Sequence, residues 1–291
     1  MFESEELIPL PEDVFRLIRD LIRDYYGIYF DDDSRYLLEK RLSRSVKTHH
    51  FSSFRDYFRH LLYDRNRGEE LASIMDVLTV NETYFFREQS QLKTFSEEIL
   101  TELRDINKDK KRLRIWSAGC STGEEPYTLA MLVIENGNFR DWDIEILGSD
   151  INQRVLQVAR SGIYSKNSFR TTMPYFIDKY FKEEGSLFRI SHSIKQHVNF
   201  SYLNLLDPFK VKLIGKMDVI FCRNVLIYFD QQSRKKVIEI FHERLMAGGY
   251  FLLGHAESLI NLSTAFTLRH FKHDMVYQKP IKKGVHTDVQ D

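Results

Sequence analysis

Apolar residues recur every three to four positions through the first third of the chain, which is the spacing that places them on one face of an α-helix. The recurring positions form four groups: Val14, Leu17, Ile18, Leu21 and Ile22; Leu37, Leu38 and Leu42; Phe54, Tyr57, Phe58 and Leu61; and Leu71, Ile74, Met75 and Leu78. Helix breakers are scarce, because no proline occurs between Pro11 and Pro126. The pattern predicts a helical domain over residues 1–92.

After a charged run at residues 108–112, short apolar runs alternate with helical segments. They predict strands at 113–117, 144–148, 198–203, 217–222 and 250–253, and helices at 127–134, 155–160 and 237–246. Gly248 and Gly249 are interpreted as the end of the last helix. This alternation predicts a doubly wound, Rossmann-like α/β domain with a parallel sheet over residues 93–291, ending in a loose polar tail at 281–291.

The composition is that of a folded globular protein. Its 291 residues carry 42 Lys and Arg against 42 Asp and Glu, and 43% are hydrophobic, which excludes a mainly disordered chain and a general nucleic-acid coat. No run approaches the ~18 apolar residues of a membrane span, and the acidic start lacks the apolar segment of a secretory signal. Two cysteines, Cys120 and Cys222, cannot form a disulfide framework. We therefore expect a cytoplasmic protein without membrane insertion, and a monomer.

Candidate chemistry begins at the turn after the first predicted strand, where Gly119 and Gly123 allow a sharp bend and the close approach of a ligand. Glu124 and Glu125 open the next helix, where carboxylates either complement the helix dipole or repel phosphate and attract a cation. Asp150 follows the second strand, where an acid can hydrogen-bond ribose hydroxyls. Together these features indicate a nucleoside ligand that carries ammonium or sulfonium and no phosphate, such as S-adenosylmethionine.

The same turn matches G-x-S-x-G, the nucleophile elbow of serine hydrolases, with Ser121 as nucleophile and His255 in a triad. Against this alternative, the turn follows the first strand of the sheet, and no oxyanion segment precedes it. Two carboxylates one turn away would also disfavour an oxyanion. The ten histidines form no H-E-x-x-H or Cys/His cluster, so no catalytic metal is expected.

Three longer motifs carry a family resemblance: NETYFFRE at 81–88, WSAGCSTGEEPY at 116–127 and FCRNVLIYFD at 221–230. In this order they resemble the CheR-type chemotaxis receptor methyltransferases, over nearly the whole chain. The resemblance implies a class I S-adenosylmethionine-dependent methyltransferase domain with a small β-subdomain at about 181–204. It also implies methyl transfer to glutamate carboxylates on the cytoplasmic helices of chemotaxis receptors, with S-adenosylhomocysteine as the second product.

The resemblance also implies roles for individual residues. Arg87 and Tyr228 are expected to face the methyl group and the incoming glutamate, which makes them the candidate catalytic residues. The expected cofactor-binding residues are Asn81, Thr83, Arg87, Gly119, Glu124 or Glu125, Asp150, Asn204, Leu205, Arg223 and Asn224. One sequence does not decide between Glu124 and Glu125.

The expected reaction suits the residues present. A glutamate side chain is already ionised at neutral pH, so methyl transfer to it needs no general base. Base-methylating enzymes carry an (N/D/S)-P-P-(Y/F) run, whereas residues 224–228 read NVLIY, so no nucleic-acid substrate is expected. A cofactor-binding module without catalysis is the remaining alternative, and it is disfavoured because every expected cofactor position is occupied by a matching residue.

A basic helix face is the candidate partner surface. Lys40, Arg44 and Lys47 are spaced to share one face of a predicted helix. The face is either solvated or a docking surface for acidic receptor helices, and the resemblance favours docking. The turn at 182–186 is short, which puts binding of a receptor C-terminal peptide in doubt.

Overall fold

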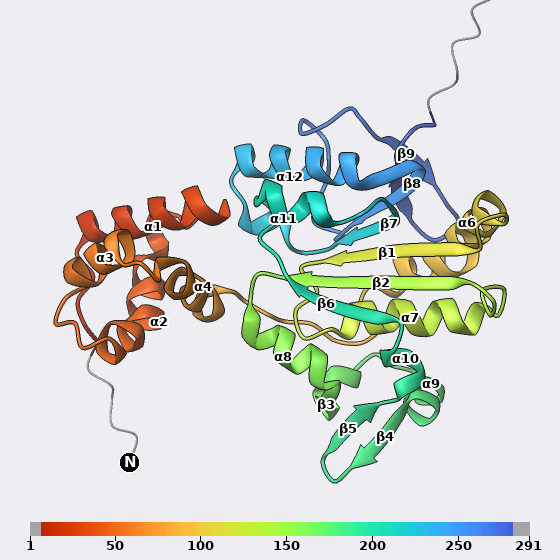
Figure 1. Ribbon diagram of the computed structural model, residues 1–291, viewed down its shortest axis with the longest axis horizontal. Helices are drawn as coiled ribbons and strands as arrows, with labels where there is room; N and C mark the ends of the chain where they lie inside the picture. Colours follow the sequence, from red (N-terminus) through yellow and green to blue (C-terminus); the bar gives the residue numbers. More distant parts are fainter. Residues whose placement is uncertain (1–6, 282–291) are drawn as a thin grey trace, which may run out of the picture.

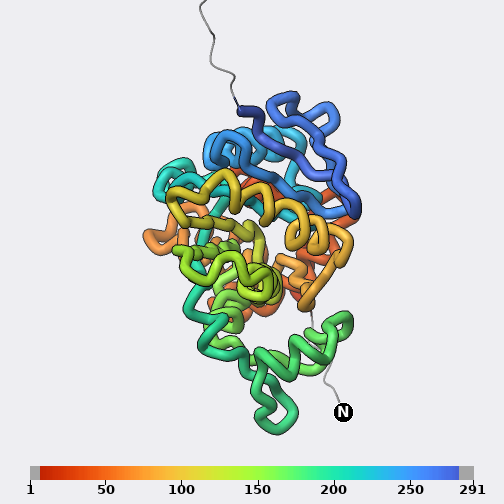
Figure 2. Tube along the Cα trace, turned by 90° about the vertical axis from the view of Figure 1, so that its right-hand side faces the viewer, coloured from red at the N-terminus to blue at the C-terminus, as the bar shows by residue number. Residues whose placement is uncertain are grey.

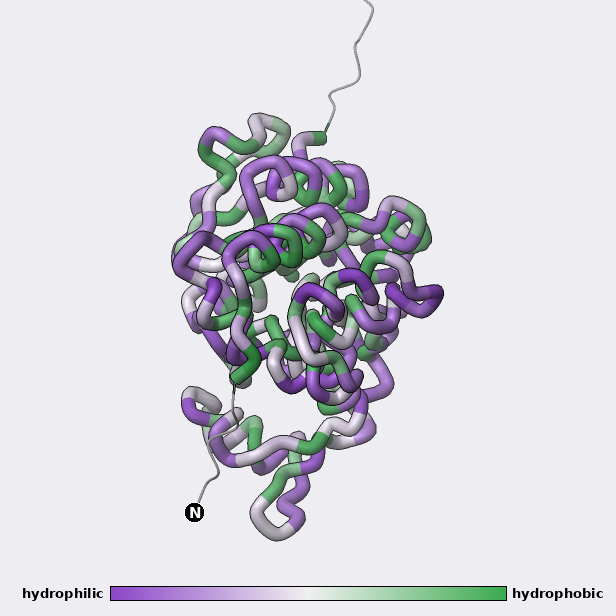
Figure 3. Tube along the Cα trace, turned by 90° about the vertical axis from the view of Figure 1, so that its left-hand side faces the viewer, coloured by the Kyte–Doolittle hydropathy of each residue, from purple (hydrophilic) through white to green (hydrophobic). Residues whose placement is uncertain are grey.

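The computed structural model describes residues 7–281, so the predicted tail from residue 282 onward lies outside the described part of the chain. The first elements are four helices grouped at one end of the molecule (Figure 1): α1 (Glu12–Tyr26), α2 (Arg35–Thr48), α3 (Phe54–Tyr63) and α4 (Arg67–Leu78). Viewed from that end, their turns alternate between hydrophilic and hydrophobic positions (Figure 3). The predicted helical domain is confirmed.

Local sequence explains where these helices begin and end. Glu12 and Asp13 lie in the first turn of α1, where negative charge complements the helix dipole. The same helix ends at Gly27, which takes a left-handed conformation with φ 69° and donates its N–H to the Arg23 carbonyl. The Ser53 hydroxyl accepts a hydrogen bond from the backbone N–H of Asp56 and so caps α3.

A seven-stranded sheet forms the body of the second domain, in the order β6-β2-β1-β7-β8-β10-β9. The strands are β1 (Arg112–Ala118), β2 (Asp143–Asp150), β6 (Val198–Tyr202), β7 (Met217–Cys222), β8 (Leu245–Leu253), β9 (Thr267–His270) and β10 (Met275–Gln278). The five strands from β6 to β8 are parallel, whereas β10 and β9 pair antiparallel. The sheet is thus mixed, not wholly parallel as predicted.

Helices cover both faces of this sheet (Figure 1). Alternation along the strands sends Ile115 into one core and Trp116 into the other. On the first face lie α5 (Gln89–Lys93), a π-helical turn (Thr94–Ile99), α6 (Leu100–Asn107) and α7 (Glu124–Asn136); on the second lie α11 (Pro208–Leu213) and α12 (Gln231–Arg244). The doubly wound α/β fold is confirmed.

The predicted end of the last helix is wrong. Helix α12 stops at Arg244, and its C-cap Leu245 already has the extended conformation of strand β8. Gly248 and Gly249 lie inside that strand, where the backbone N–H of Gly248 donates to the Lys279 carbonyl, beyond the end of β10. The glycine pair therefore lies where the pairing of β8 with β7 is irregular, between the pairs Met217–Leu245 and Val219–Tyr250, and it does not cap a helix.

A small three-stranded sheet stands apart from the body of the molecule (Figure 2). Its strands are β3 (Ile163–Ser165), β4 (Phe181–Glu184) and β5 (Leu187–Ile190), in the order β3-β5-β4. It is flanked by α8 (Gln153–Ser161), α9 (Pro174–Tyr180) and α10 (His192–Lys195). Compared with the predicted range 181–204, the small sheet takes β3 from further upstream, while β6 belongs to the large sheet.

The two domains meet beside the carboxyl ends of the parallel strands. The helical core ends at Leu78, and Phe85 and Leu92 are already packed with the sheet, so the predicted boundary at residue 92 lies inside the second core. The Asn152 side-chain amide donates to Thr79 Oγ1 over 2.7 Å. Ile28 and Phe229 form an isolated antiparallel bridge. These contacts close the helical domain over one edge of the sheet.

Candidate active site

A cavity of about 450 Å³ lies between the helical domain and the carboxyl ends of β1, β2, β6 and β7. This is the edge where open α/β sheets bind ligands, next to the point at which the strand order reverses between β1 and β7. The apolar part of its wall comes from both domains: Ile28, Phe30, Leu37, Met75, Leu78, Val80, Ile151, Leu203, Leu205, Val225, Ile227 and Phe229.

The turn after β1 forms the floor of the cavity. The N–H groups of Gly119 and Cys120 both donate to the Ser149 carbonyl, which folds the turn against β2. Gly119 has φ 78°, and a Cβ at this position would lie 2.3 Å from Val225 Cγ2. Only glycine permits this packing, because the β7 loop touches the turn directly.

Asp150 lies at the centre of this floor. Its Oδ2 accepts the Ser121 N–H over 2.8 Å, and its Oδ1 accepts the Asn152 N–H over 2.9 Å. The residue is 7% exposed and lines the cavity. Burial raises the pKa of Asp150, while donation by the backbone N–H groups of Asn152 and Ser121 opposes the rise. Each oxygen keeps further acceptor capacity for a ligand hydroxyl.

The structure separates the two candidate glutamates at the start of α7. Glu124 is 2% exposed and turns away from the cavity, since its carboxylate accepts hydrogen bonds from the hydroxyls of Thr122 and Ser168. Burial raises the pKa of Glu124. Glu125 lines the cavity instead. Its carboxylate accepts from Ser117 Oγ over 2.7 Å and from Arg223 Nε over 2.6 Å.

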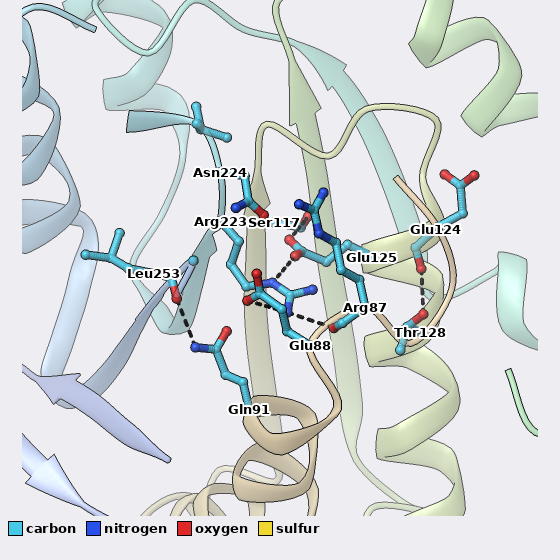
Figure 4. Close-up of polar contacts among 12 residues, drawn as sticks. Arg87, Glu88, Gln91, Ser117, Glu124, Glu125, Thr128, Arg223, Asn224 and Leu253 are labelled. Carbon is cyan, nitrogen blue, oxygen red and sulfur yellow. Dashed lines mark hydrogen bonds and ion pairs between the residues drawn. The ribbon is translucent and has the colours of Figure 1, made fainter. Parts of the chain in front are cut away.

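Arg223 links the two carboxylates that surround it to the backbone of the loop before α5 (Figure 4). Its side chain is 4% exposed and makes ion pairs with Glu125 and Glu88. Arg223 Nη1 also donates to the Arg87 carbonyl over 2.9 Å. A buried guanidinium with this set of partners holds the cavity-facing carboxylate and the Arg87 backbone in fixed relation.

The segment that joins the two domains supplies another wall. Asn81, Thr83 and Arg87 all line the cavity. Arg87 Nη1 donates to the Glu82 carbonyl over 2.8 Å, and no carboxylate within residues 7–281 forms a salt bridge with Arg87. Tyr228 lines the cavity from the β7 loop and is 38% exposed. The cavity thus has a guanidinium and a phenol at its accessible side.

One predicted cofactor contact, Asn204, does not reach the cavity. Leu205 lines the cavity, but Asn204 is not among its lining residues. The Asn204 amide donates to the Tyr25 carbonyl over 2.8 Å, at the end of α1. Asn204 therefore ties the helical domain to the β6 loop. Asn224 and Gly119, by contrast, both lie on the cavity wall.

The geometry gives no support to a hydrolase. Ser121 lines the cavity, yet its Oγ is buried and has no hydrogen-bond partner, whereas a nucleophilic serine needs a base within hydrogen-bond reach. The His255 side chain is 53% exposed, is paired with Glu88 at 3.7 Å and does not line the cavity. Within residues 7–281 there is also no group of three or more His, Cys, Asp or Glu able to hold a metal ion.

The wall fits the nucleoside ligand that the sequence indicates. Asp150 is placed to accept hydroxyl donors, and the apolar residues suit an adenine ring. Sequence reasoning missed the contribution of the helical domain, from which Ile28, Met75 and Leu78 reach the cavity. Met75 and Leu78 are ordinary apolar positions of the amphipathic helix α4, and Ile28 follows the end of α1. No local signal distinguishes these three residues from core residues.

Comparisons with known proteins agree with the geometry. The family model "CheR methyltransferase, all-alpha domain" matches residues 13–79, and "CheR methyltransferase, SAM binding domain" matches residues 81–275. The chain is 41% identical to chemotaxis protein methyltransferase 2 of Vibrio cholerae, covering 89% of this chain and 92% of that protein. It is 35% identical to the chemotaxis protein methyltransferase of Borreliella burgdorferi, covering 85% of this chain and 88% of that protein.

A solved O-methyltransferase family protein from Burkholderia thailandensis has a TM-score of 0.40 and 13% identity, covering 87% of this chain and 72% of that one. No helix of the described residues is long and apolar enough to span a membrane. Both family models match in sequence order and together span most of the chain. The protein therefore belongs to the CheR methyltransferase family, with an all-helical domain followed by an S-adenosylmethionine-binding domain.

Proposed function

We propose that this protein transfers methyl groups from S-adenosylmethionine to glutamate side chains on the cytoplasmic helices of chemotaxis receptors. The observation that carries the proposal is that Arg87 and Tyr228, which come from distant segments, line the same cavity as Asp150. A carboxylate can enter beside the guanidinium and the phenol while the acid below holds a nucleoside. The family membership and the names of the two relatives support this substrate class.

The chain's own residues do little acid–base chemistry in this reaction. S-adenosylmethionine supplies an electrophilic methyl group on its sulfonium. The substrate glutamate is already a carboxylate at neutral pH, so the protein needs no base to activate it. Arg87 is placed to orient that carboxylate with forked hydrogen bonds, because it forms no salt bridge with the described part of the chain. Catalysis then comes mainly from alignment and from exclusion of water.

Two carboxylates of the cavity, Asp150 and Glu125, bind different parts of the cofactor. Asp150 accepts the ribose hydroxyls, which is the role of an acid at the end of the second strand. Glu125 presents the negative charge nearest to the ammonium end of the ligand, although Arg223 and Ser117 already share its oxygens. Each carboxylate oxygen has two lone pairs, so an ammonium can still be accepted there. Glu124 does not line the cavity, so it has no direct part in binding the ammonium group.

The receptor-facing surface combines an apolar rim with basic side chains. The rim residues Leu37, Val80, Ile227 and Tyr228 are all exposed and all line the cavity. On α2, Lys40, Arg44 and Lys47 are exposed, and Leu37 lies on the same helix. A helical receptor segment with acidic residues around its methylated glutamate matches this arrangement in charge.

The proposal is tested by incubating the protein with methyl-labelled S-adenosylmethionine and a receptor cytoplasmic fragment. Label released by mild alkali is expected on receptor glutamates, because carboxyl methyl esters hydrolyse readily. Ser121→Ala should retain transfer within a few-fold, and the wild-type protein should not react with a fluorophosphonate. Binding of S-adenosylmethionine without transfer to any receptor glutamate would overturn the proposed substrate. Stoichiometric labelling of Ser121 would restore the hydrolase.

Charge reversal on α2 should weaken receptor docking without touching the cofactor site. Replacing Lys40, Arg44 and Lys47 by glutamate is expected to raise KM for the receptor fragment about tenfold at low salt, because the Debye length is then ~30 Å at 0.01 M, compared with ~8 Å at physiological salt, and steering charges act further. The increase should shrink at high salt, while affinity for S-adenosylmethionine stays unchanged. Rates at two ionic strengths measure it.

A matched control has the same net-charge change elsewhere on the surface. Lys212, Lys235 and Lys236 are exposed on α11 and α12 and do not line the cavity. Reversing these three should leave KM close to that of the wild type. An unchanged KM and salt dependence in the α2 variant would show that receptors dock elsewhere. An equal effect of both variants would show that only the net charge of the protein matters, and not the position of the basic residues on α2.

A further inference from the structure

One carboxylate outside the predicted site binds the backbone of the cavity wall. Glu257 follows β8 in the segment Gly254–His255–Ala256–Glu257. Its Oε2 accepts the N–H groups of Asn224 over 2.7 Å and of Gly254 over 2.9 Å. Its Oε1 accepts those of Val225 over 3.0 Å and Ile227 over 3.2 Å. A single side chain thus satisfies four backbone donors.

Three of these donors belong to the loop between β7 and α12, which forms one wall of the cavity. Asn224, Val225, Ile227 and Tyr228 all line the cavity. The loop has little regular structure beyond the 3-10 turn Leu226–Tyr228, and Asn224 takes a left-handed conformation with φ 59°. Asparagine tolerates this conformation better than most residues with a side chain, but it still adopts it much less readily than glycine. The Glu257 carboxylate restrains the loop in this conformation.

The approach of the two segments also depends on Gly254. A Cβ at this position would lie 2.9 Å from the Asn224 backbone nitrogen and 2.9 Å from its side-chain nitrogen, and 3.0 Å from Glu257 Oε2. Any larger residue would therefore push the loop away from the end of β8. Two features thus keep Asn224 close to the end of β8: the lack of a side chain at Gly254 and the hydrogen bonds of the Glu257 carboxylate.

The charge of Glu257 is turned toward this loop and not toward a cation. Among the described residues it takes part in no salt bridge, and its recorded hydrogen bonds all come from backbone N–H groups. Burial raises the pKa of Glu257, and the N–H groups of Asn224 and Gly254 act in the opposite direction. Hydrogen bonds to a carboxylate are stronger than neutral ones, so their loss would free the loop.

We propose that Glu257 is a positioning residue for methyl transfer, which holds the loop 224–228 so that Asn224 and Tyr228 face the cavity. The inference rests on the proposed function for its kinetic consequence. Its structural core, the anchoring of this loop by one carboxylate, is independent of the substrate. Glu257 does not touch the cavity, so it acts only through the loop.

The test compares the wild type with Glu257→Gln and Gly254→Ala. Glutamine keeps the shape but presents an amide NH₂ to N–H donors, so about half of the hydrogen bonds are lost. We expect kcat at saturating receptor fragment and S-adenosylmethionine to fall at least tenfold. Small displacements of residues that position the reacting atoms lower the rate about ten- to a hundredfold. Gly254→Ala should lower kcat in the same direction. KM for the receptor fragment should change less than kcat.

The control is Glu239→Gln, which removes one negative charge from an exposed position of α12. Its kcat should equal that of the wild type. Amide hydrogen exchange gives a readout that needs no methyl acceptor: Glu257→Gln should lose protection at residues 224, 225 and 227, with other segments unchanged. If the wild-type protein fails to methylate receptors while this loss of protection is seen, the proposed function fails and the anchoring role stands.

Two results would overturn the inference. Unchanged exchange at the loop in both variants would show that Glu257 does not restrain it. A lowered thermal unfolding midpoint with wild-type kcat for the folded fraction would show that the carboxylate serves stability alone.

Discussion

Replacing Asp150 by alanine is expected to weaken binding of S-adenosylmethionine about 100-fold. Asp150 is buried at the cavity floor, and both of its oxygens retain acceptor capacity beyond the hydrogen bonds from Ser121 and Asn152. Two hydrogen bonds from ribose hydroxyls to a carboxylate contribute ~1.5–3 kcal/mol each. Losing about 3 kcal/mol corresponds to roughly 100-fold in Kd. S-adenosylhomocysteine should weaken equally, because both ligands contain the same ribose.

The structure adds a second consequence for the same variant. Alanine leaves the backbone N–H groups of Ser121 and Asn152 without their acceptor, which costs ~1–3 kcal/mol for each group that water does not reach. Affinity is therefore measured by titration calorimetry well below the unfolding midpoint. Asp150→Asn, which keeps one acceptor oxygen, should bind more weakly than the wild type and more tightly than Asp150→Ala.

Asp143→Ala is the matched control, since Asp143 lies at the opposite end of the same strand and is exposed. It should bind S-adenosylmethionine like the wild type. Wild-type affinity in folded Asp150→Ala would show that this acid only shapes the turn after β1, and another group would have to hold the nucleoside.

Replacing Arg87 by alanine should lower turnover about 100-fold at saturating receptor. One guanidinium nitrogen of Arg87 donates to the Glu82 carbonyl, and Arg87 forms no salt bridge with the described residues. Its other N–H donors therefore remain for a substrate carboxylate. Alignment of the reacting atoms contributes factors of this size. Because the contact is a short, direct pairing of the guanidinium with the substrate carboxylate, the loss should depend little on salt. Single-turnover rates with a receptor fragment measure it.

Two variants make the Arg87 result specific. Arg87→Lys keeps the charge but loses the planar fork, so partial recovery would assign the remaining effect to geometry. Arg170 is a neighbouring arginine: its guanidinium lies 3.8 Å from the centre of the Tyr84 ring, and that of Arg87 lies 5.8 Å from the same ring centre. Arg170 pairs with Glu82 and does not line the cavity. Arg170→Ala should keep normal turnover. If Arg87→Ala raises only KM and its rise disappears at high salt, Arg87 is a docking charge.

Much of the architecture follows from the sequence alone. Helical spacing of Val14, Ile18 and Ile22 predicts a buried helix face, and all three are fully buried in α1. The strand predicted at 217–222 coincides with β7. Such elements depend on the alternation of apolar and polar positions within a few residues, which local sequence contains in full. Asp150 and the turn after β1 were predicted together for the same reason, because strand ends in a parallel sheet meet at one edge.

Other features depend on residues that lie far apart in the chain. Glu124 and Glu125 are adjacent residues of the same type. Ser168 donates a hydrogen bond to Glu124, which faces away from the cavity, whereas Arg223 donates one to Glu125, which lines the cavity. Asn204 was predicted to lie beside the ligand, but its side-chain amide donates to the Tyr25 carbonyl instead. No local pattern distinguishes these outcomes, since each partner comes from a different element of the fold.

Local patterns of residues are enough to predict the helical and α/β domains, the turn after β1 with Asp150, and the family resemblance. Three features follow only from the packing of the folded chain: which carboxylate faces the cavity, which residues of the helical domain line it, and that Glu257 binds the backbone of its wall. The physical reason is range. Hydrophobic periodicity and turn chemistry act between residues a few positions apart, whereas a buried hydrogen bond forms with whichever partner the packed fold brings within about 3 Å.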